Sequence, residues 1–526
     1  MITVDRRTLL QLLTVAGTAR LLGGAAPAAA AEGLELGPPE DFSYDWLKRH
    51  ARGLAAEPYD APPRPDPAIV ERIDYDAHGK LKFDKDKALF GESAYPISFQ
   101  HVGLYFPKTV RMHALENGKA RQVLYDPNLF TIGDDHVAAD LPPEPSAFAG
   151  FWVHEPRRKG PLAEVEPWAT FLGASYFRGV GELGQVGLSA RGIALDPGGA
   201  GPEEFPDFVS YWFEPAETEK DPVTVYALLD GPSIAGAYRF VLRRTEGVVM
   251  DIEANLHPRA SIERLGLAPL TSMYWYSETR KPTMIDWRPE VHDSDGLELW
   301  TGAGERIWRP LNNPHRISIS SFSDENPRGF GLMQRDRAFD NYLDGVRYHR
   351  RPSAWVEPQG DWGAGVVQLV EIPTDDEIHD NITAMWIPDA PHGAGSHIAL
   401  NYRLHWLADS PYPGELARCV ATRLGRGGQP GTPRPQDVRK FMIEFLGGPL
   451  KDLPKGVLPE PVLSASRGEF SYIFTEAVPN DVPGHWRAQF DLAVEGTEPV
   501  ELRCYLKNED RVLTETWLYQ YHPTDA

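Results

Sequence analysis

The chain has 526 residues, enough for two or three domains of roughly 100–200 residues each. Its composition, 42% hydrophobic and 24% charged, excludes a disordered, collagenous or coiled-coil protein, and 48 Gly with 48 Pro favour a turn-rich β architecture. Lys and Arg number 53 against 75 Asp and Glu, and the resulting net charge of -22 disfavours nucleic acid as a partner.

The N-terminus differs in composition from the rest of the chain. Arg6 and Arg7 precede a short apolar run, and a small-residue stretch ends at Ala31, where the A-x-A pattern predicts cleavage. The apolar run is too short to span about 30 Å of hydrocarbon, which disfavours a membrane anchor. We therefore expect residues 1–31 to be a signal peptide. Its paired arginines favour export of the folded protein by the twin-arginine translocase.

Strands are expected to dominate after one early helix. Residues 41–55 carry an apolar stripe at helical spacing and are closed by Pro58. Residues 248–256 and 398–406 instead alternate apolar and polar side chains, which is the period of a half-buried strand. Antiparallel sheets packed face to face explain both segments.

A change in composition follows Trp406. Gly and Pro are dense between residues 425 and 435, and strand-like alternation resumes afterwards. The sequence thus predicts a large β domain over residues 32–408, a linker over 409–436 and a small β-sandwich over 437–526.

The two cysteines, Cys419 and Cys504, are too few for a disulfide framework or a thiolate zinc site. Cys504 alternates in phase with Val500 and Leu502, which favours an ordinary buried strand residue. Whether the two cysteines are bonded to each other stays open.

Three acidic groups, at residues 292–296, 323–327 and 375–381, lie in an aromatic-rich stretch. Glycoside hydrolysis needs one carboxylic acid to protonate the leaving oxygen and a second carboxylate to handle water or the anomeric carbon. Short acidic side chains that cap their own turns are the alternative, and the pattern leaves it open. Six tryptophans of this stretch could stack on sugar rings, although most aromatic side chains fill cores: Trp275, Trp300, Trp308, Trp355, Trp362 and Trp386.

Other chemistries have weaker support. His292, Asp293 and Asp295 could contribute metal ligands, but the remaining positions of a calcium loop are missing and no H-E-x-x-H occurs. No G-x-S-x-G nucleophile elbow is present either. We expect neither a metal ion nor a cofactor.

Several runs of residues carry a resemblance to a known family, the periplasmic glucan biosynthesis proteins OpgG and OpgD. The similarity extends from about Phe42 to the C-terminus, and the paired arginines favour the D-type member. The runs that carry it are residues 171–178, 289–297, 308–314, 324–332 and 355–358.

The resemblance implies an all-β fold, with a large galactose-mutarotase-like β-sandwich followed by a small immunoglobulin-like β-sandwich. It also implies a periplasmic protein that makes or trims osmoregulated glucans, whose backbone is β-1,2-linked glucose. Relatives resemble inverting endo-β-1,2-glucanases. On their pattern, Asp380 would be the general acid and Asp293, with Asp295 as second choice, the general base acting through waters. Tyr348 would help to hold those waters.

A non-catalytic protein that binds glucan, or guides it for the inner-membrane glucan synthase, is the competing hypothesis. Such a scaffold would also need aromatic platforms and an acidic exterior. If Asp293 and Asp380 lie together, hydrolysis is favoured; if either caps a remote turn, the scaffold is favoured.

Overall fold

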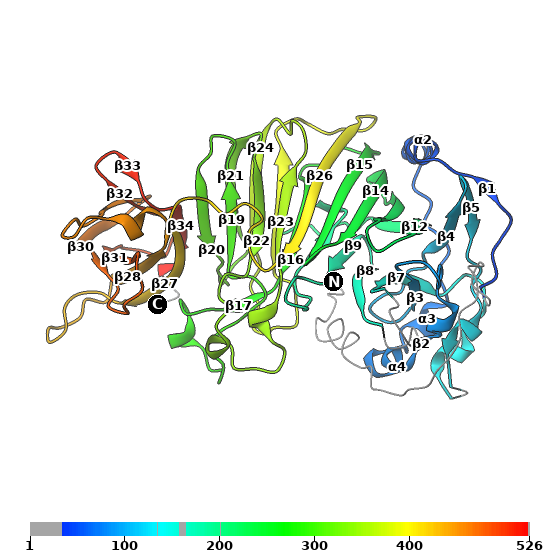
Figure 1. The fold of residues 1–526 in the computed structure, drawn as a ribbon, viewed down its shortest axis with the longest axis horizontal. Coiled ribbons are helices and arrows are strands. Elements are labelled where there is room, and N and C mark those ends of the chain that lie inside the picture. The colour runs from blue at the N-terminus through cyan, green and yellow to red at the C-terminus, as the bar shows by residue number, and fades with distance from the viewer. Residues whose placement is uncertain (1–33, 134, 157–164, 200, 524–526) are drawn as a thin grey trace.

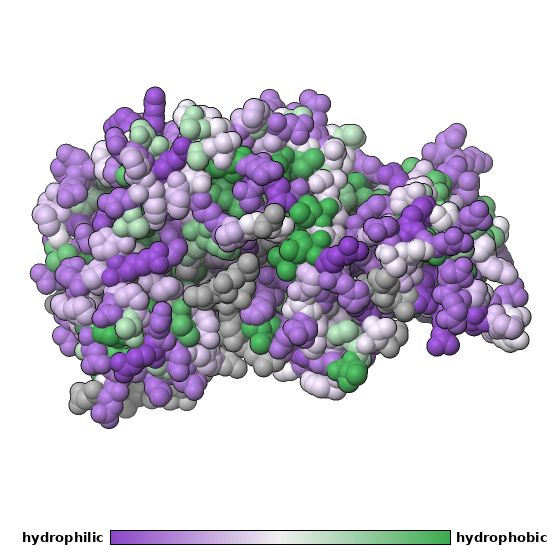
Figure 2. Space-filling model, turned by 180° about the vertical axis from the view of Figure 1, so that it is seen from behind, coloured by the Kyte–Doolittle hydropathy of each residue, from purple (hydrophilic) through white to green (hydrophobic). Residues whose placement is uncertain are grey.

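The computed structural model describes residues 34–133, 135–156, 165–199 and 201–523. The predicted signal peptide, with Arg6, Arg7 and Ala31, lies outside these residues. Strands dominate the described chain, which confirms the all-β prediction. Figure 1 shows an elongated molecule with the C-terminal strands at one end and the N-terminal helices at the other, and Figure 2 shows that hydrophilic residues cover much of the rear face.

One large sheet runs through most of the molecule (Figure 1). Its strands, in spatial order, are β1 (Glu40–Asp41), β5 (Lys119–Gln122), β4 (Arg111–Glu116), β12 (Asp207–Glu214), β13 (Val223–Asp230), β14 (Ile234–Arg244), β15 (Val248–Pro258), β26 (Ile398–Leu407), β23 (Ser353–Pro358), β22 (Gly329–Met333), β19 (Gly296–Trp300), β20 (Arg306–Pro310), β34 (Thr516–Tyr521), β32 (Val500–Asn508) and β29 (Glu460–Ala465), with β33 (Arg511–Val512) beside β32.

A second sheet packs against the first. Its order is β21 (Ser318–Glu325), β24 (Ala364–Glu371), β25 (Ile382–Pro388), β16 (Leu265–Ser272), β10 (Ser189–Arg191), β9 (Tyr176–Gly179), β8 (Pro167–Leu172), β7 (Phe148–His154) and β3 (Ile97–His101), with β11 (Ile193–Leu195) beside β16. Two short ribbons, β2 (Lys82–Phe83) with β6 (Phe130–Thr131) and β17 (Tyr274–Tyr276) with β18 (Val291–His292), lie outside both sheets.

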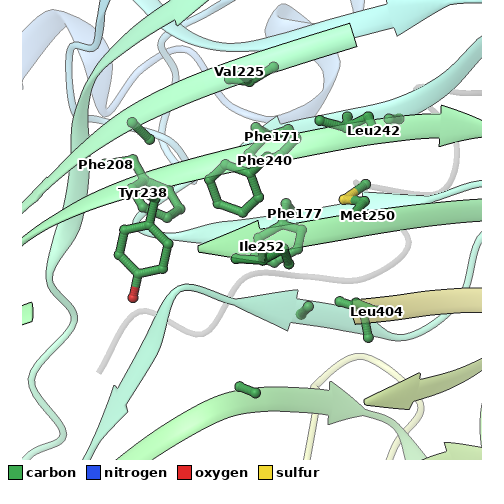
Figure 3. Packing of buried hydrophobic residues seen from close by; sticks show 14 of the residues in the cluster. Phe171, Phe177, Phe208, Val225, Tyr238, Phe240, Leu242, Met250, Ile252 and Leu404 are labelled. Atoms are coloured by element: carbon green, nitrogen blue, oxygen red, sulfur yellow. The ribbon is translucent and has the colours of Figure 1, made fainter. Parts of the chain in front are cut away.

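The core lies between the two large sheets (Figure 3). Phe171 of β8 and Phe177 of β9 meet Phe240 of β14, with ring centroids 5.1 Å and 5.2 Å apart. The strands predicted at 248–256 and 398–406 are confirmed, and they are neighbours: Val248 pairs with Trp406 in antiparallel register. The alternation holds them in place because a one-residue slip would turn their apolar faces away from this core.

The predicted helix is also confirmed, as α2 (Tyr44–Ala55). Ser43 caps it by accepting a hydrogen bond from the Trp46 N–H at 3.1 Å, and Leu47 and Ala51 pack on the outer face of the large sheet. The remaining helices are α3 (Pro67–Val70), α4 (Tyr75–Lys80) and the short 3-10 turns η1 (Lys85–Lys87), η2 (Pro127–Leu129), η3 (Val137–Asp140), η5 (Lys281–Thr283), η6 (Phe339–Asn341), η7 (Tyr348–Arg350) and η8 (Gly448–Asp452). No helix among the described residues has the length and apolarity to cross a membrane.

The C-terminal part is a smaller sandwich. Its own sheet has the order β27 (Arg418–Arg426), β28 (Val438–Leu446), β31 (His485–Ala493) and β30 (Glu469–Ala477), and it shares a core with β34 and β32. Strand β34 also pairs in parallel with β20, where Trp308 is opposite Trp517, so the large sheet continues into this part.

The segment 409–436 was expected to be a linker, but it contains β27, which pairs with β28. The dense Gly and Pro residues form the connection between these two strands, where turns are needed. The division of the chain into domains stays a prediction. Cys419 and Cys504 are both buried and are not bonded to each other.

Candidate functional site

The ribbon β17–β18 organises the segments that carry Asp293 and Asp380. The Asp293 N–H donates to the Met273 carbonyl oxygen at 2.9 Å, directly before β17. Asn381, the neighbour of Asp380, binds both backbone groups of Tyr274: its Oδ1 accepts from the N–H at 2.8 Å and its amide donates to the carbonyl oxygen at 2.9 Å. Asp293 and the neighbour of Asp380, which are far apart in the sequence, thus bind the consecutive residues Met273 and Tyr274.

Asp293 is fully buried and forms an ion pair with Arg351, whose side chain is also buried. The Arg351 guanidinium carbon lies 4.3 Å from the centroid of the Tyr348 ring. Arg351 follows η7 directly, so the backbone turn that places Tyr348 also places Arg351. Charge pairing, together with the aromatic face, offsets part of the cost of keeping this guanidinium away from water.

Tyr348 connects this pair to a second cluster of charges. Its hydroxyl donates to Glu377 Oε2 at 2.7 Å, and Arg288 Nη1 donates to the same oxygen at 2.7 Å. Arg288 also contacts Asp344 at 3.2 Å. Side chains from both sides of β18, from η7 and its flanks, and from the segment before β25 therefore form one connected network.

Asp380 is half-buried and lies within electrostatic reach of the same network. Burial lowers the pKa of the Arg178 guanidinium, and the negative charge of Asp380 is the largest influence in the opposite direction. Burial likewise lowers the pKa of Arg351, and Asp380 is one of the acidic groups that oppose this. Arg351 is thus the ion-pair partner of Asp293 and an electrostatic neighbour of Asp380.

Asp295 has a different role in the structure. Its Oδ2 accepts hydrogen bonds from the backbone N–H groups of Arg335 at 2.9 Å and Asp336 at 2.8 Å. Burial raises the pKa of this carboxyl, while the charge of His292 and these two hydrogen bonds oppose the rise. This is the turn-capping alternative that the sequence left open, and it favours Asp293 over Asp295 for chemistry.

His292 is held by side chains on both of its ring nitrogens. Nδ1 lies 2.9 Å from Gln334 Oε1, and Nε2 lies 2.9 Å from Glu290 Oε2. Burial alone would lower the pKa of His292, but the hydrogen bond and negative charge of Glu290 outweigh it and raise the pKa. Both nitrogens are occupied, so this imidazole is poorly placed as a metal ligand. Within the described residues no group of three or more His, Cys, Asp or Glu could hold a metal ion.

Comparison with known proteins identifies the family. Residues 42–521 match the family described as periplasmic glucan biosynthesis protein, MdoG. The chain belongs to this family. One relative is glucans biosynthesis protein D 2 of Ralstonia nicotianae, which is 59% identical over 99% of this chain and 98% of its own length. Another is glucans biosynthesis protein D of Xanthomonas campestris pv. campestris, which is 46% identical over 95% of this chain and 94% of its own length. Glucans biosynthesis protein D of Stenotrophomonas maltophilia is 46% identical over 93% of this chain and 92% of its own length.

The resemblance seen in the sequence is therefore confirmed, and the chain has a role in periplasmic glucan biosynthesis. The fold also corrects the prediction that all six tryptophans could stack on sugar rings. Trp308, Trp355 and Trp386 are only 5%, 1% and 1% exposed, because the cores of the sandwiches enclose them, and they offer no face to a glucan.

The other three predicted tryptophans are half-buried. Trp300 packs under the guanidinium groups of Arg306 and Arg328, at 3.8 Å and 5.3 Å, away from the network around Arg351. Trp362 packs against the buried Trp386. Of the six, only Trp275 contacts the network, with the Arg288 guanidinium carbon 5.9 Å from its ring centroid.

The acidic group at residues 323–327 lies at the end of β21, and Asp324 caps the turn between β19 and β20. Both carboxylate oxygens of Asp324 accept from the Gly302 N–H, at 3.1 Å and 3.0 Å. The sequence reasoning missed Arg351 and Arg288, because a buried arginine looks like a surface arginine in a single sequence, and it included Glu377 only as a member of the acidic group at residues 375–381. Their only signal was the density of charge beside the acidic groups, which turn chemistry explains equally well.

Proposed function

We propose that the mature protein is an inverting endo-β-1,2-glucanase that trims the glucan backbone. The observation that supports this most strongly is the position of Arg351, which is ion-paired with Asp293 and lies within electrostatic reach of Asp380. An inverting glycosidase uses two carboxyl groups, about 6.5–9.5 Å apart to leave room for water, and Asp293 and Asp380 are two of the acidic groups near Arg351.

In the proposed reaction, Asp380 protonates the oxygen of the scissile glycosidic bond. Water attacks the anomeric carbon from the opposite side, and its proton passes through other waters to Asp293. Arg351 orients the Asp293 carboxylate as its ion-pair partner. The Tyr348 hydroxyl donates to Glu377 and so keeps its oxygen lone pairs for accepting from a water in that path.

A non-catalytic glucan-binding role is the second candidate, because Asp293 is fully buried and its ion pair also suits a purely structural function. In that role the protein would hold nascent glucan for the inner-membrane synthase. The two candidates differ in whether the purified protein releases new reducing ends from linear β-1,2-glucan.

The test compares the wild-type protein with Asp380→Asn. General acid participation contributes about 10²- to 10⁴-fold, so Asp380→Asn should lose at least about a hundredfold in kcat. The matched control is Asp324→Asn, which alters a turn-capping carboxylate and should retain full activity. Undiminished cleavage by Asp380→Asn would show that the acid is another residue.

Periplasmic targeting through the twin-arginine translocase is part of the same proposal, and it rests on Arg6 and Arg7 ahead of the apolar run. Changing both arginines to Lys should leave the precursor in the cytoplasm. Normal export of that double variant would exclude this route.

A further inference from the structure

The connection between β17 and β18 exposes two large apolar side chains beside the charged network. Ile285 is fully exposed and Trp287 is 67% exposed. By contrast, the six tryptophans discussed above are buried or half-buried. A largely exposed indole is costly to leave in water and is common where a protein binds a ligand with an apolar face.

Trp287 is held in place by its neighbour in sequence. The Arg288 guanidinium carbon lies 5.8 Å from the Trp287 ring centroid and 5.9 Å from that of Trp275, so the cation touches both rings. Arg288 is itself buried and anchored: Asp286 Oδ1 accepts from its Nε at 3.0 Å, and Glu377 from its Nη1 at 2.7 Å. The hydrogen bond to Arg288 lowers the pKa of Asp286 to about 2, so this anchor stays charged at neutral pH.

The anchored ring is connected to the proposed catalytic residues through side-chain contacts. Glu377, which binds Arg288, also accepts from the Tyr348 hydroxyl, and the Tyr348 ring contacts Arg351. A short series of direct contacts therefore leads from Trp287 to the Asp293–Arg351 ion pair. Trp287 is the exposed end of this series of contacts, at 67% exposure.

We propose that Trp287 is a stacking platform for one glucosyl ring of the bound glucan, and that Arg288 holds the indole in the required position. The inference rests on the proposed function. The apolar C–H face of glucose matches the exposed indole, and the uncharged sugar needs no counter-charge from the platform. Because stacking on a remote ring is the same in the ground state and the transition state, it should affect KM rather than kcat.

The experiment compares Trp287→Ala, Trp287→Phe and the wild-type protein on linear β-1,2-glucan. Loss of the platform should raise KM about tenfold in Trp287→Ala with kcat changed less than about twofold, and Trp287→Phe should recover most of the loss. The control is Leu458→Ser, which removes an equally exposed apolar side chain (66%) from the C-terminal sandwich and should change neither constant. Glucan should also change the intrinsic tryptophan fluorescence of the wild-type protein, and this change should shrink in Trp287→Phe.

Unchanged KM in Trp287→Ala, with normal cleavage by the wild-type protein, would overturn the platform and leave the glucanase intact. If Trp287→Ala instead abolished a self-association of the wild-type protein at unchanged KM, the exposed ring would belong to a protein contact and the platform would also be wrong. A wild-type protein that neither binds nor cleaves the glucan would refute the proposed function, and the platform with it.

Discussion

The buried ion pair between Asp293 and Arg351 gives a prediction that separates structure from chemistry. Removal of one partner from a buried pair leaves an uncompensated charge and typically costs about 3–5 kcal/mol. Both side chains here are at most 1% exposed, so water cannot replace the lost partner. Three other carboxylates still favour the charged form of Arg351: Asp344, Glu377 and Asp380. We therefore expect the free energy of unfolding of Asp293→Ala to fall by about 3 kcal/mol, the lower end of that range.

Asp293→Asn should behave differently, because the amide oxygen of Asn can still accept from Arg351. Its stability loss should be about 1–2 kcal/mol, close to one charge-assisted hydrogen bond replaced by a neutral one, although its activity should fall as far as that of Asp293→Ala. Denaturant titrations followed by tryptophan fluorescence give the stabilities, and reducing-end release gives the activities. An Asp293→Ala variant with the wild-type unfolding midpoint would refute the argument that removing Asp293 leaves Arg351 buried without its ion-pair partner.

Three further predictions concern the rest of the molecule. Burial, with a smaller contribution from the charge of Glu290, raises the pKa of Glu278 from 4.5 to about 7. The free energy of unfolding should therefore fall as pH rises from 4.5 to 7 and level off above, by no more than about 3 kcal/mol. Unfolding titrations across pH 4–8 should show this fall in the wild-type protein and not in Glu278→Gln. Glu515→Ala should cost about 3 kcal/mol because it takes a carboxylate from the buried Arg335, which it contacts at 2.6 Å, and an unchanged unfolding midpoint would contradict this. Limited proteolysis should cut first in the Gly- and Pro-rich connection at 427–437, and a first cut within the strands of the large sheets would exclude that.

Local patterns in the sequence predicted the parts of the fold that depend on them. Alternation at 248–256 and 398–406 predicted two strands with buried faces, since period-two burial is a property of each segment alone. The parallel pairing of β20 with β34 could not be predicted, because it joins residues about 200 positions apart and leaves no periodic signal in either strand. The strand β27 inside the expected linker could not be predicted for a related reason: glycines that form a turn between two strands look the same as glycines between two domains.

The candidate site could be predicted only in part. Resemblance to a family pointed to Asp293, Asp380 and Tyr348, but the arginine that connects them has no pattern of its own. The tryptophans show the opposite problem. Density of Trp along the chain suggested sugar platforms, whereas burial depends on which sheet face each residue occupies, and Trp355 and Trp386 face the core.

The anomeric configuration of the first product tests the central claim most directly. Hydrolysis of linear β-1,2-glucan by the wild-type protein, followed by proton NMR from the first seconds, should show the new reducing end in the α configuration before mutarotation, because water attacks from the face opposite the leaving group. A β-configured first product would mean a covalent intermediate and a different pair of carboxyl groups. A protein that binds the glucan and yields no reducing end at all would contradict the enzymatic account and favour the scaffold.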